Sequence, residues 1–296
     1  MAGVVSQPDR PKGRGRKLEP TPVKLVAEKH GLPLIQPESL RKDPGPLEWI
    51  KNLHPDLLIV VAYGLILPAS LLDVPQDGGW NVHASMLPKY RGAAPIEWAI
   101  LRGETKTGIT LMQMDAGMDT GDIILQEETE IGPEETGGQV TGRLTELGKE
   151  LLLEGLQLRD EGRIRRRPQE NSLATLAPMI EKEDREIDWN DTAINIHDKI
   201  RGFNPRPGAR AGDLKLLRSR IIAQSRQVGT PPPPLAPDVK PGVALDVIHE
   251  GIWVATGEGI LLLTEVQHPG GRPMPAADYA RGRHLKPGQK IGLISG

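Results

Sequence analysis

The sequence predicts an α/β layered domain followed by a small β-barrel domain, within a chain of 296 residues. Strand-like runs alternate with helix-like periods up to about residue 160, as in a layered α/β domain. Residues 57–63 read LLIVVAY, a continuous apolar run typical of a strand buried on both faces of a parallel sheet. Beyond residue 200 the strand-like pieces are short and separated by turns, without long helices, which indicates a barrel.

The first predicted helix has clear signals at both ends. Thr21 is a suitable N-cap, Pro22 suits the first helical position, and Gly31 can end the helix in a left-handed conformation. Val23 and Val26, together with Ala27, are expected to form its buried face.

The remaining elements follow from the same kinds of pattern. Further helices are expected over residues 40–53 (broken near 44–46), 65–72, 96–101, from about 135, and over 191–200, where Ile194, His197 and Ile200 share a face. Strands are expected over residues 34–35, 57–63, 80–85, 108–114, 122–130, 214–222, 243–249, 251–256 and 260–267.

Composition excludes several classes of protein. Hydrophobic residues make up 38% and charged residues 26%, which is enough to bury a core. The net charge of -2 excludes a globally basic nucleic-acid-binding protein, so any site for a polyanion must be a local patch. The absence of cysteine excludes disulfides and thiolate chemistry and suggests a cytoplasmic protein. No apolar run approaches the ~20 residues of a membrane span.

Residues 81–95, NVHASMLPKYRGAAP, contain several polar side chains close together that could carry out chemistry. On a strand, Asn81, His83 and Ser85 point to the same face, and ligands gather at the carboxyl ends of such strands. Asp119, on a Gly-rich turn between two strands, can bring a carboxylate to the same place. The alternative interpretation is structural, with Asn81 capping a turn and His83 satisfied in the core. The histidines are too scattered to indicate a metal site.

A basic segment near the start has two interpretations. Residues 7–20, QPDRPKGRGRKLEP, are rich in Gly and Pro and cannot form a helix, so they predict an exposed basic loop. Such a loop is either a solvated surface or a contact for a polyanion.

Four sequence stretches carry a resemblance to a known family. NVHASMLPKYRGAAPIEWAI, ITLMQMDAGMDTGDI, VVSQPDRPKGRGRKLEPTPVK and IRGFNPRPGA resemble the methionyl-tRNA formyltransferases, a branch of the folate-dependent formyltransferases. The Asn-x-His strand and the Asp loop are shared by all folate-dependent formyltransferases. The basic segment is characteristic of the branch that acts on tRNA.

The resemblance implies a fold and a reaction. It implies a Rossmann-like formyltransferase domain over residues 1–162, a linker over 163–180 and an OB-like tRNA-binding domain over 181–296. The enzyme would transfer a formyl group from 10-formyltetrahydrofolate to the α-amino group of methionyl initiator tRNA, in translation initiation. A monomer is expected, with no metal and no membrane partner.

The same resemblance implies roles for individual residues. The catalytic residues are Asn81, His83 and Asp119. The folate-binding residues are Ser85, Met86, Leu87, Pro88, Tyr63 and Gly64. The tRNA-binding residues are Arg10, Lys12, Arg14, Arg16, Lys17 and Arg206.

Two departures from the family keep other functions open. The family normally begins with a strand, a Gly-containing turn and a helix before VVSQPDR, and this unit is not in the sequence. Without it we expect an exposed sheet edge and a weakened folate site. Arg206 stands where the family usually has Trp. The alternatives are therefore a catalytically impaired tRNA-binding remnant and a folate-dependent formyltransferase for another amine.

Overall fold

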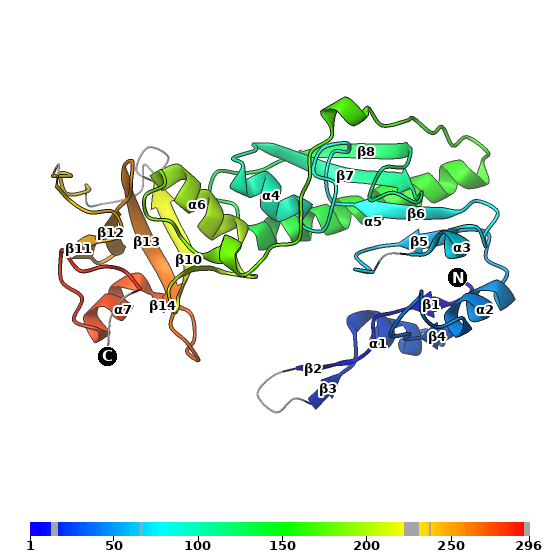
Figure 1. Ribbon diagram of the computed structural model, residues 1–296, viewed down its shortest axis with the longest axis horizontal. Coiled ribbons are helices and arrows are strands. Elements are labelled where there is room, and N and C mark those ends of the chain that lie inside the picture. Colours follow the sequence, from blue (N-terminus) through cyan, green and yellow to red (C-terminus); the bar gives the residue numbers. More distant parts are fainter. Residues whose placement is uncertain (13–16, 66, 222–230, 237, 293–296) are drawn as a thin grey trace. The chain divides into compact units, whose positions relative to one another are not determined.

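The computed structural model describes residues 1–12, 17–65, 67–221, 231–236 and 238–292 (Figure 1). The chain divides into two compact units. The first unit comprises residues 1–91, 109–127 and 148–175, and the second comprises residues 92–108, 128–147 and 176–296. No helix in the described part of the chain combines the length and apolar character needed to cross a membrane.

The first unit contains a four-stranded sheet, a two-stranded sheet and a hairpin. In chain order its elements are β1 (Val4–Val5), β2 (Arg10–Lys12), β3 (Lys17–Glu19), α1 (Pro22–Lys29), β4 (Leu34–Ile35), α2 (Gly45–Asn52), β5 (Leu58–Val60), α3 (Ala69–Leu72), β6 (Gly79–His83), most of β7 (Lys106–Gln113) and β8 (Ile123–Glu130), the second part of α5 (Gly137–Asp160) and the short turn η1 (Asn171–Leu173). The larger sheet has the order β5-β6-β7-β8, with β5 parallel and β7 antiparallel to β6.

Helix α1 is capped as predicted but buries a different face. The Thr21 hydroxyl accepts a hydrogen bond from the Lys24 amide at 3.1 Å, and Pro22 is the first helical residue. Val23 and Val26 are 50% and 56% exposed, while Ala27 is buried. The prediction of a Val23–Val26 face is wrong because this eight-residue helix packs one narrow side against β4 and leaves the rest in solvent.

The strand predicted to be buried on both faces is an edge strand. β5 has three residues. Among the residues that the structure describes, β5 pairs only with β6 and β1 only with β4, so each has one edge without a partner strand there. Ile59 is 42% exposed and Val61 56% exposed. Nevertheless Val5 of β1 and Leu58 of β5 pack into one apolar cluster. The exposure of Ile59 and Val61 shows that the prediction of a strand buried on both faces is wrong.

Helix α5 lies along one face of the four-stranded sheet (Figure 1). Glycine allows this close approach: a Cβ added at Gly155 would lie 2.3 Å from a methyl carbon of Leu111 on β7 and 3.4 Å from the ring of Trp80 on β6. The helix begins with a capping box, in which the Thr136 amide donates to the Gln139 side chain and the Gln139 amide donates back to Thr136. Helix α5 thus packs directly against β6, the strand that carries the candidate site.

The second unit is built around an antiparallel sheet. Its elements are α4 (Pro95–Leu101), the first part of α5, η2 (Glu183–Arg185), α6 (Ala193–Gly202), β9 (Ala209–Ala211), β10 (Leu214–Ile221), β11 (Ala244–Ile248), β12 (Gly251–Ala255), β13 (Ile260–Gln267), β14 (Met274–Pro275) and α7 (Ala276–Gly282). The sheet order is β11-β12-β13-β10-β9, with β14 paired to β13.

The second unit is mostly β, but its sheet does not close into a barrel in the part of the chain that the structure describes. Its two outer strands, β9 and β11, each pair with one neighbour and not with each other. The mostly-β C-terminal unit expected from the sequence is therefore present, but closure of its sheet into a barrel is not detected among the described residues. The helix α7, which the sequence did not predict, packs against β12 and β13.

Helix α6 begins and ends two residues later than predicted, and its buried face differs from the predicted one. Ile196 and Ile200 are fully buried in the core of the second unit, whereas Ile194 is 53% exposed. His197 is buried as expected, with its ring bonded to the Ser219 hydroxyl at 2.9 Å and the Pro133 carbonyl at 3.1 Å. Ile196 and Ile200, which lie four residues apart, therefore define the buried face of α6, and Ile194 lies outside that face.

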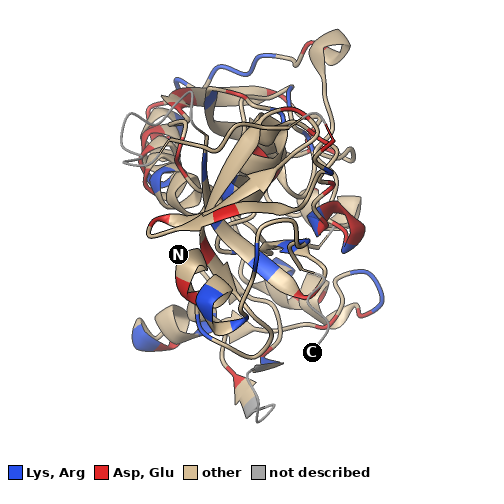
Figure 2. Ribbon diagram, turned by 90° about the vertical axis from the view of Figure 1, so that its left-hand side faces the viewer, with Lys and Arg blue, Asp and Glu red and all other residues tan. Residues whose placement is uncertain are grey.

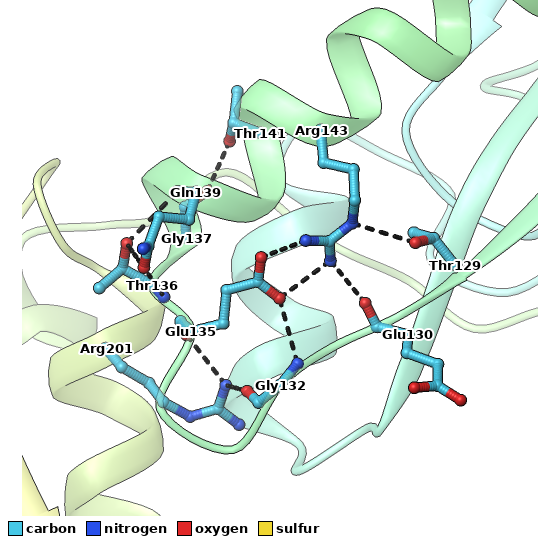
Figure 3. Close-up of polar contacts among 10 residues, drawn as sticks. All are labelled: Thr129, Glu130, Gly132, Glu135, Thr136, Gly137, Gln139, Thr141, Arg143 and Arg201. Carbon is cyan, nitrogen blue, oxygen red and sulfur yellow. Dashed lines mark hydrogen bonds and ion pairs between the residues drawn. The ribbon is translucent and has the colours of Figure 1, made fainter.

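A network of charged groups joins the end of β8, the start of α5 and α6 (Figure 3). Arg143 on α5 donates to both carboxylate oxygens of Glu135 and, at 3.0 Å, to the Thr129 hydroxyl. Arg201 on α6 donates to the main-chain carbonyls of Gly132 and Glu135 at 3.2 and 3.1 Å. The loop between β8 and α5 is thus held by two guanidinium groups.

The Glu135 carboxylate should make the stability of the chain depend on acid pH. Its side chain is 17% exposed, and its pKa lies below the usual value of 4.5, mainly because Arg143 donates a hydrogen bond to it. A folded-state pKa below the unfolded value stabilises the protein above that unfolded value, and the contribution is lost as the pH falls through the folded pKa. We expect Glu135→Gln to lower the free energy of unfolding by about 1–3 kcal/mol at pH 7.

Denaturant titrations between pH 7 and pH 3 would measure this dependence. The difference between the native chain and Glu135→Gln should shrink as the pH falls below the usual glutamate value of 4.5. A difference that stays constant over that range would contradict the assignment of the acid dependence to Glu135.

Candidate functional site

Three predicted residues meet at the carboxyl end of β6. Asn81 and His83 lie two residues apart on this strand, and Asp119 lies on the loop between β7 and β8. The His83 Nδ1 atom is 3.5 Å from one carboxylate oxygen of Asp119, and the Asn81 amide donates to the other at 3.4 Å. An amide, an imidazole and a carboxylate therefore converge as the sequence predicted.

The hydrogen bonds of His83 fix where its protons lie. Its Nε2 atom is 2.9 Å from the carbonyl oxygen of Tyr90, which can only accept, so Nε2 carries a hydrogen. The Nδ1 atom, on the other side of the ring, faces the Asp119 carboxylate at 3.5 Å.

His83 and Asp119 differ in how deeply their side chains are buried. The His83 side chain is 6% exposed, and that of Asp119 is 17% exposed. The burial of His83 matches the structural alternative of a satisfied core histidine. However, its Nδ1 faces the partly exposed carboxylate of Asp119, and such a pair can take part in proton transfer.

The backbone at the site adopts rarely populated conformations. Tyr90 and Asp119 have φ angles of 62° and 55°, in the left-handed region that residues other than glycine seldom adopt. Residues held in this way cluster at functional sites, where the surrounding structure imposes the conformation. The Tyr90 carbonyl and the Asp119 carboxylate are the two groups that bracket the His83 ring.

Gln169 ties these two strained segments together. Its side-chain amide nitrogen donates to the main-chain carbonyls of Asp119 and Gly121, at 2.8 and 2.7 Å. Its oxygen accepts from the guanidinium group of Arg91, which is buried and also bonds Asn171. Sequence reasoning missed Gln169, because a single glutamine 50 residues after the loop that it supports carries no pattern.

The predicted folate-binding segment after β6 is held rigidly by its neighbours. The fully buried Ser85 donates from its hydroxyl to the Lys89 carbonyl at 2.6 Å, and its carbonyl accepts from Thr110 at 2.6 Å. Leu87 is buried in an apolar cluster. Met86 and Pro88 are partly exposed. The buried side chains of Ser85 and Leu87 thus hold the segment in place. Met86 and Pro88 are the residues of this segment with solvent-accessible side chains.

The other predicted folate contacts lie after β5. The carbonyl of Tyr63 accepts a hydrogen bond from Gln7 at 2.8 Å, and its ring belongs to the apolar cluster beside β1. Its hydroxyl oxygen is buried without a partner among the described residues, and burial raises the pKa of this phenol. Gly64 is exposed, with φ at 75°.

The predicted tRNA-binding residues occupy two places. Arg10 lies on β2 and is exposed, and Arg206 is exposed in the connector after α6. Strands β2 and β3 form an antiparallel hairpin, so the basic segment has more regular structure than the loop that we predicted. Arg14, Arg16 and the side chains of Lys12 and Lys17 lie outside the described residues.

Two further observations concern ligands. Among the described residues no group of three or more His, Cys, Asp or Glu side chains could hold a metal ion. A cavity of about 500 Å³ opens beside β6 and is lined by Asp77, Gln113, Asp115 and their neighbours, without Asn81, His83 or Asp119.

Comparison with known proteins gives consistent matches over both parts of the chain. The family model described as formyl transferase matches residues 1–156, and the model described as formyl transferase, C-terminal domain, matches residues 179–284. Two curated proteins called methionyl-tRNA formyltransferase are similar to this chain. One, from Geobacter sulfurreducens, is 44% identical over 293 residues, covering 99% of this chain and 89% of the relative. The other, from a Synechococcus strain, is 46% identical over 98% of this chain and 90% of the relative.

Solved structures share the fold. The sugar 3N-formyltransferase WlaRD, determined with dTDP and 5-N-formyl-THF, matches with a TM-score of 0.63 and 16% identity, over 91% of this chain and 88% of the other. HypX from Aquifex aeolicus, in complex with tetrahydrofolic acid, matches with a TM-score of 0.62 and 21% identity, over 88% of this chain and 44% of the other.

Proposed function

The chain belongs to the methionyl-tRNA formyltransferase family, and from this premise we propose how its own residues carry out the formyl transfer of that family. The formyl donor is 10-formyltetrahydrofolate. The acceptor is the α-amino group of methionine esterified to initiator tRNA. The reaction centre is the cluster of Asn81, His83 and Asp119.

The first step is attack by the neutral amine on the formyl carbon. An α-amino group titrates near ~8, so a useful fraction is neutral at physiological pH. The attack forms a tetrahedral intermediate with a developing oxyanion. The Asn81 side-chain amide has two N–H groups, and its 3.4 Å bond to Asp119 leaves one of them for this oxygen.

We assign stabilisation of the oxyanion charge to His83 and transfer of the amine proton to Asp119. Since Nε2 of His83 is bonded to the Tyr90 carbonyl, the ring acts on the oxyanion through its positive charge rather than through a direct bond. Asp119 orients the ring through Nδ1 and, being the more exposed partner, takes the proton from the attacking amine. When the intermediate collapses, the bond between the formyl carbon and the folate nitrogen breaks, and Asp119 gives the proton to this leaving nitrogen.

The folate pocket is proposed around the segment after β6. Met86 and Pro88 offer partly exposed apolar surface beside Asn81 and His83, on a segment whose backbone Ser85 and Leu87 hold in place. Tyr63 and Gly64 are proposed to supply backbone contacts to the pterin. Folate derivatives bound to solved members of the same fold support this class of cofactor.

For tRNA, the proposed contacts are the basic hairpin and the C-terminal connector. Arg10, Lys12, Arg14, Arg16 and Lys17 contribute five cations within eight residues. Arg206 adds one in the second unit. We propose a monomeric enzyme that acts in translation initiation.

The observation that carries the function is the 3.5 Å contact between His83 and Asp119 beside the Asn81 amide. The test is transfer of a radiolabelled formyl group from 10-formyltetrahydrofolate to methionyl initiator tRNA by this chain, with methionyl elongator tRNA as the control acceptor. We expect transfer to the initiator tRNA and little to the elongator. Binding of charged tRNA without transfer would support the impaired remnant, and transfer to a free amino sugar nucleotide but not to tRNA would support the alternative acceptor.

A further inference from the structure

Residues 167–175, called the bridging segment below, are anchored on two sides of the candidate site. At the start, the main chain of Arg167 exchanges two hydrogen bonds with that of Ile123 on β8, at 2.8 and 2.9 Å. At the end, the Thr175 hydroxyl accepts a hydrogen bond from the Tyr90 amide at 2.9 Å, and the Thr175 carbonyl accepts one from the next amide along the chain, also at 2.9 Å. The bridging segment therefore links the first residue of β8 to the turn that follows β6.

Gln169, near the start of the bridging segment, is matched to its neighbours by both ends of its side-chain amide. The amide nitrogen donates to the main-chain carbonyls of Asp119 and Gly121, and the amide oxygen accepts twice from Arg91. The two donors and the two lone pairs of the amide are therefore all used. A reversed amide would place its oxygen against two carbonyl oxygens, so the surroundings fix its orientation.

An amide at this position can make contacts that a carboxylate cannot. Acidic and basic residues are interspersed over the ribbon (Figure 2), and the buried Arg201 pairs with a carboxylate, that of Asp198. Arg91 is also buried, yet the side chains that accept hydrogen bonds from it are the amides of Gln169 and Asn171. A glutamate would satisfy the guanidinium group but could not donate to the two carbonyls. Gln169 is thus suited to holding the loop between β7 and β8, and not only to bonding Arg91.

The bridging segment acts on the candidate site more than on the hydrophobic core. Leu173, its one large apolar side chain, is 56% exposed. Its hydrogen bonds instead reach the Asp119 carbonyl and the Tyr90 amide, and these two residues lie beside the His83 ring. Both have φ angles in the left-handed region, at 55° and 62°, which persist only where the surrounding structure imposes them. The bridging segment therefore supplies part of the constraint at the site itself.

We propose that Gln169 and Thr175 are positioning residues for formyl transfer. The inference rests on the proposed function, which assigns the proton transfer to Asp119. Gln169 holds the main chain at this residue, so that its carboxylate stays 3.5 Å from Nδ1 of His83. Thr175 holds the Tyr90 amide, and the carbonyl oxygen of the same tyrosine lies 2.9 Å from Nε2 of His83. Together they fix the two groups between which the imidazole lies.

The first test replaces Gln169 by glutamate, which has the same shape and keeps the contact with Arg91 but places an oxygen against the two loop carbonyls. Because a misplacement of about 1 Å can cost about 10²-fold in rate, we expect Gln169→Glu to lower kcat about 10–100-fold. The KM for methionyl initiator tRNA should stay near native. Gln267→Glu is the matched control, since Gln267 donates to the Gly271 carbonyl at 2.8 Å in the second unit, and it should keep the native kcat. Thermal melting would show that both variants are folded at the assay temperature.

A double variant shows whether Gln169 acts through Asp119. In the Asp119→Asn background, adding Gln169→Glu should change kcat by less than about threefold, because the group that Gln169 positions has already been removed. A merely structural role would lower kcat by the same factor in both backgrounds.

Thr175 allows a conservative replacement. Thr175→Val removes the oxygen that accepts from the Tyr90 amide and should lower kcat about 10-fold. Thr175→Ser keeps that oxygen and should have a near-native kcat.

Hydrogen exchange measures the hold on the loop without turnover. The amides of residues 115–121 should exchange faster in Gln169→Glu than in the native chain, and at the native rate in Gln267→Glu.

Three outcomes would overturn the proposal for Gln169: a native kcat in folded Gln169→Glu, an equal loss in the Asp119→Asn background, or unchanged exchange of residues 115–121. Equal losses in Thr175→Val and Thr175→Ser would overturn the role of Thr175. Failure of the proposed function is a different result. In that case the native chain transfers no formyl group, although exchange of the loop still depends on Gln169.

Discussion

Replacing Asn81 by alanine is expected to lower kcat for formyl transfer by about 10²–10³-fold, because one preorganised donor to the oxyanion is lost. Asp119→Asn removes the carboxylate with little change in volume, and should lower kcat by about 10²–10⁴-fold through the loss of proton transfer. His83→Ala removes the imidazole that lies beside Asp119, and it should also lower kcat. Single-turnover transfer to methionyl initiator tRNA measures all three, and direct binding measures the affinity for tRNA.

The affinity for tRNA should be retained in these variants, since the three side chains act on the reacting group. His30→Ala is the control, because His30 is exposed at the end of α1 and makes no contact with the candidate site. Near-native turnover in any one of the three variants would remove that residue from the catalytic assignment.

The second large effect is expected in the second unit, at Arg201. Arg201 and Asp198 lie three residues apart on α6, are both 8% exposed, and are 2.7 Å apart between Nε and Oδ1. Arg201→Met leaves a buried carboxylate without its partner and frees the two carbonyls shown in Figure 3. Breaking a buried pair from one side costs about 3–5 kcal/mol. Chemical denaturation should show a loss of this size in the free energy of unfolding.

The chain contains a closely matched control for this experiment. Asp278 and Arg281 on α7 have the same types and spacing, but their side chains are 46% and 64% exposed. Arg281→Met should leave the unfolding midpoint unchanged within error. The double variant Asp198→Leu with Arg201→Met should lose less than Arg201→Met alone, since it removes the stranded charge. An equal loss at the buried and the exposed pair would contradict the argument from burial.

Local signals in the sequence were sufficient for most individual elements. Thr21 and Pro22 predicted the start of α1, and a short strand-like run bounded by turns predicted β13 at residues 260–267, because caps and turns act within a few residues. The faces of α1 and α6 were misjudged at Val23 and Ile194. Which side of a short helix is buried depends on what packs against it, and that is set by contacts distant in the sequence.

The apolar run at residues 57–63 shows the same limit. Its composition predicted a buried central strand, yet the composition of a strand does not determine whether it has a neighbour on both sides. β5 pairs with β6 alone, and Ile59 is 42% exposed.

The three central residues of the candidate site could be predicted because two lie on one strand and the third lies on a Gly-rich turn. The residues that hold these three in position could not be predicted. Gln169, Thr110 and the strained backbone at Tyr90 act through single contacts between distant segments.

Within the described residues β1 and β5 each have an edge without a partner strand, and such an edge can pair with another chain. In a parallel ladder alternate residues face the neighbouring strand, so the amide and carbonyl of Ile59 point away from β6. Backbone pairing does not depend on sequence, and an extended segment of another copy satisfies these groups as well as any other. Because β5 offers only three residues, each such encounter forms few bonds, so self-association through this edge should be reversible and should grow with concentration.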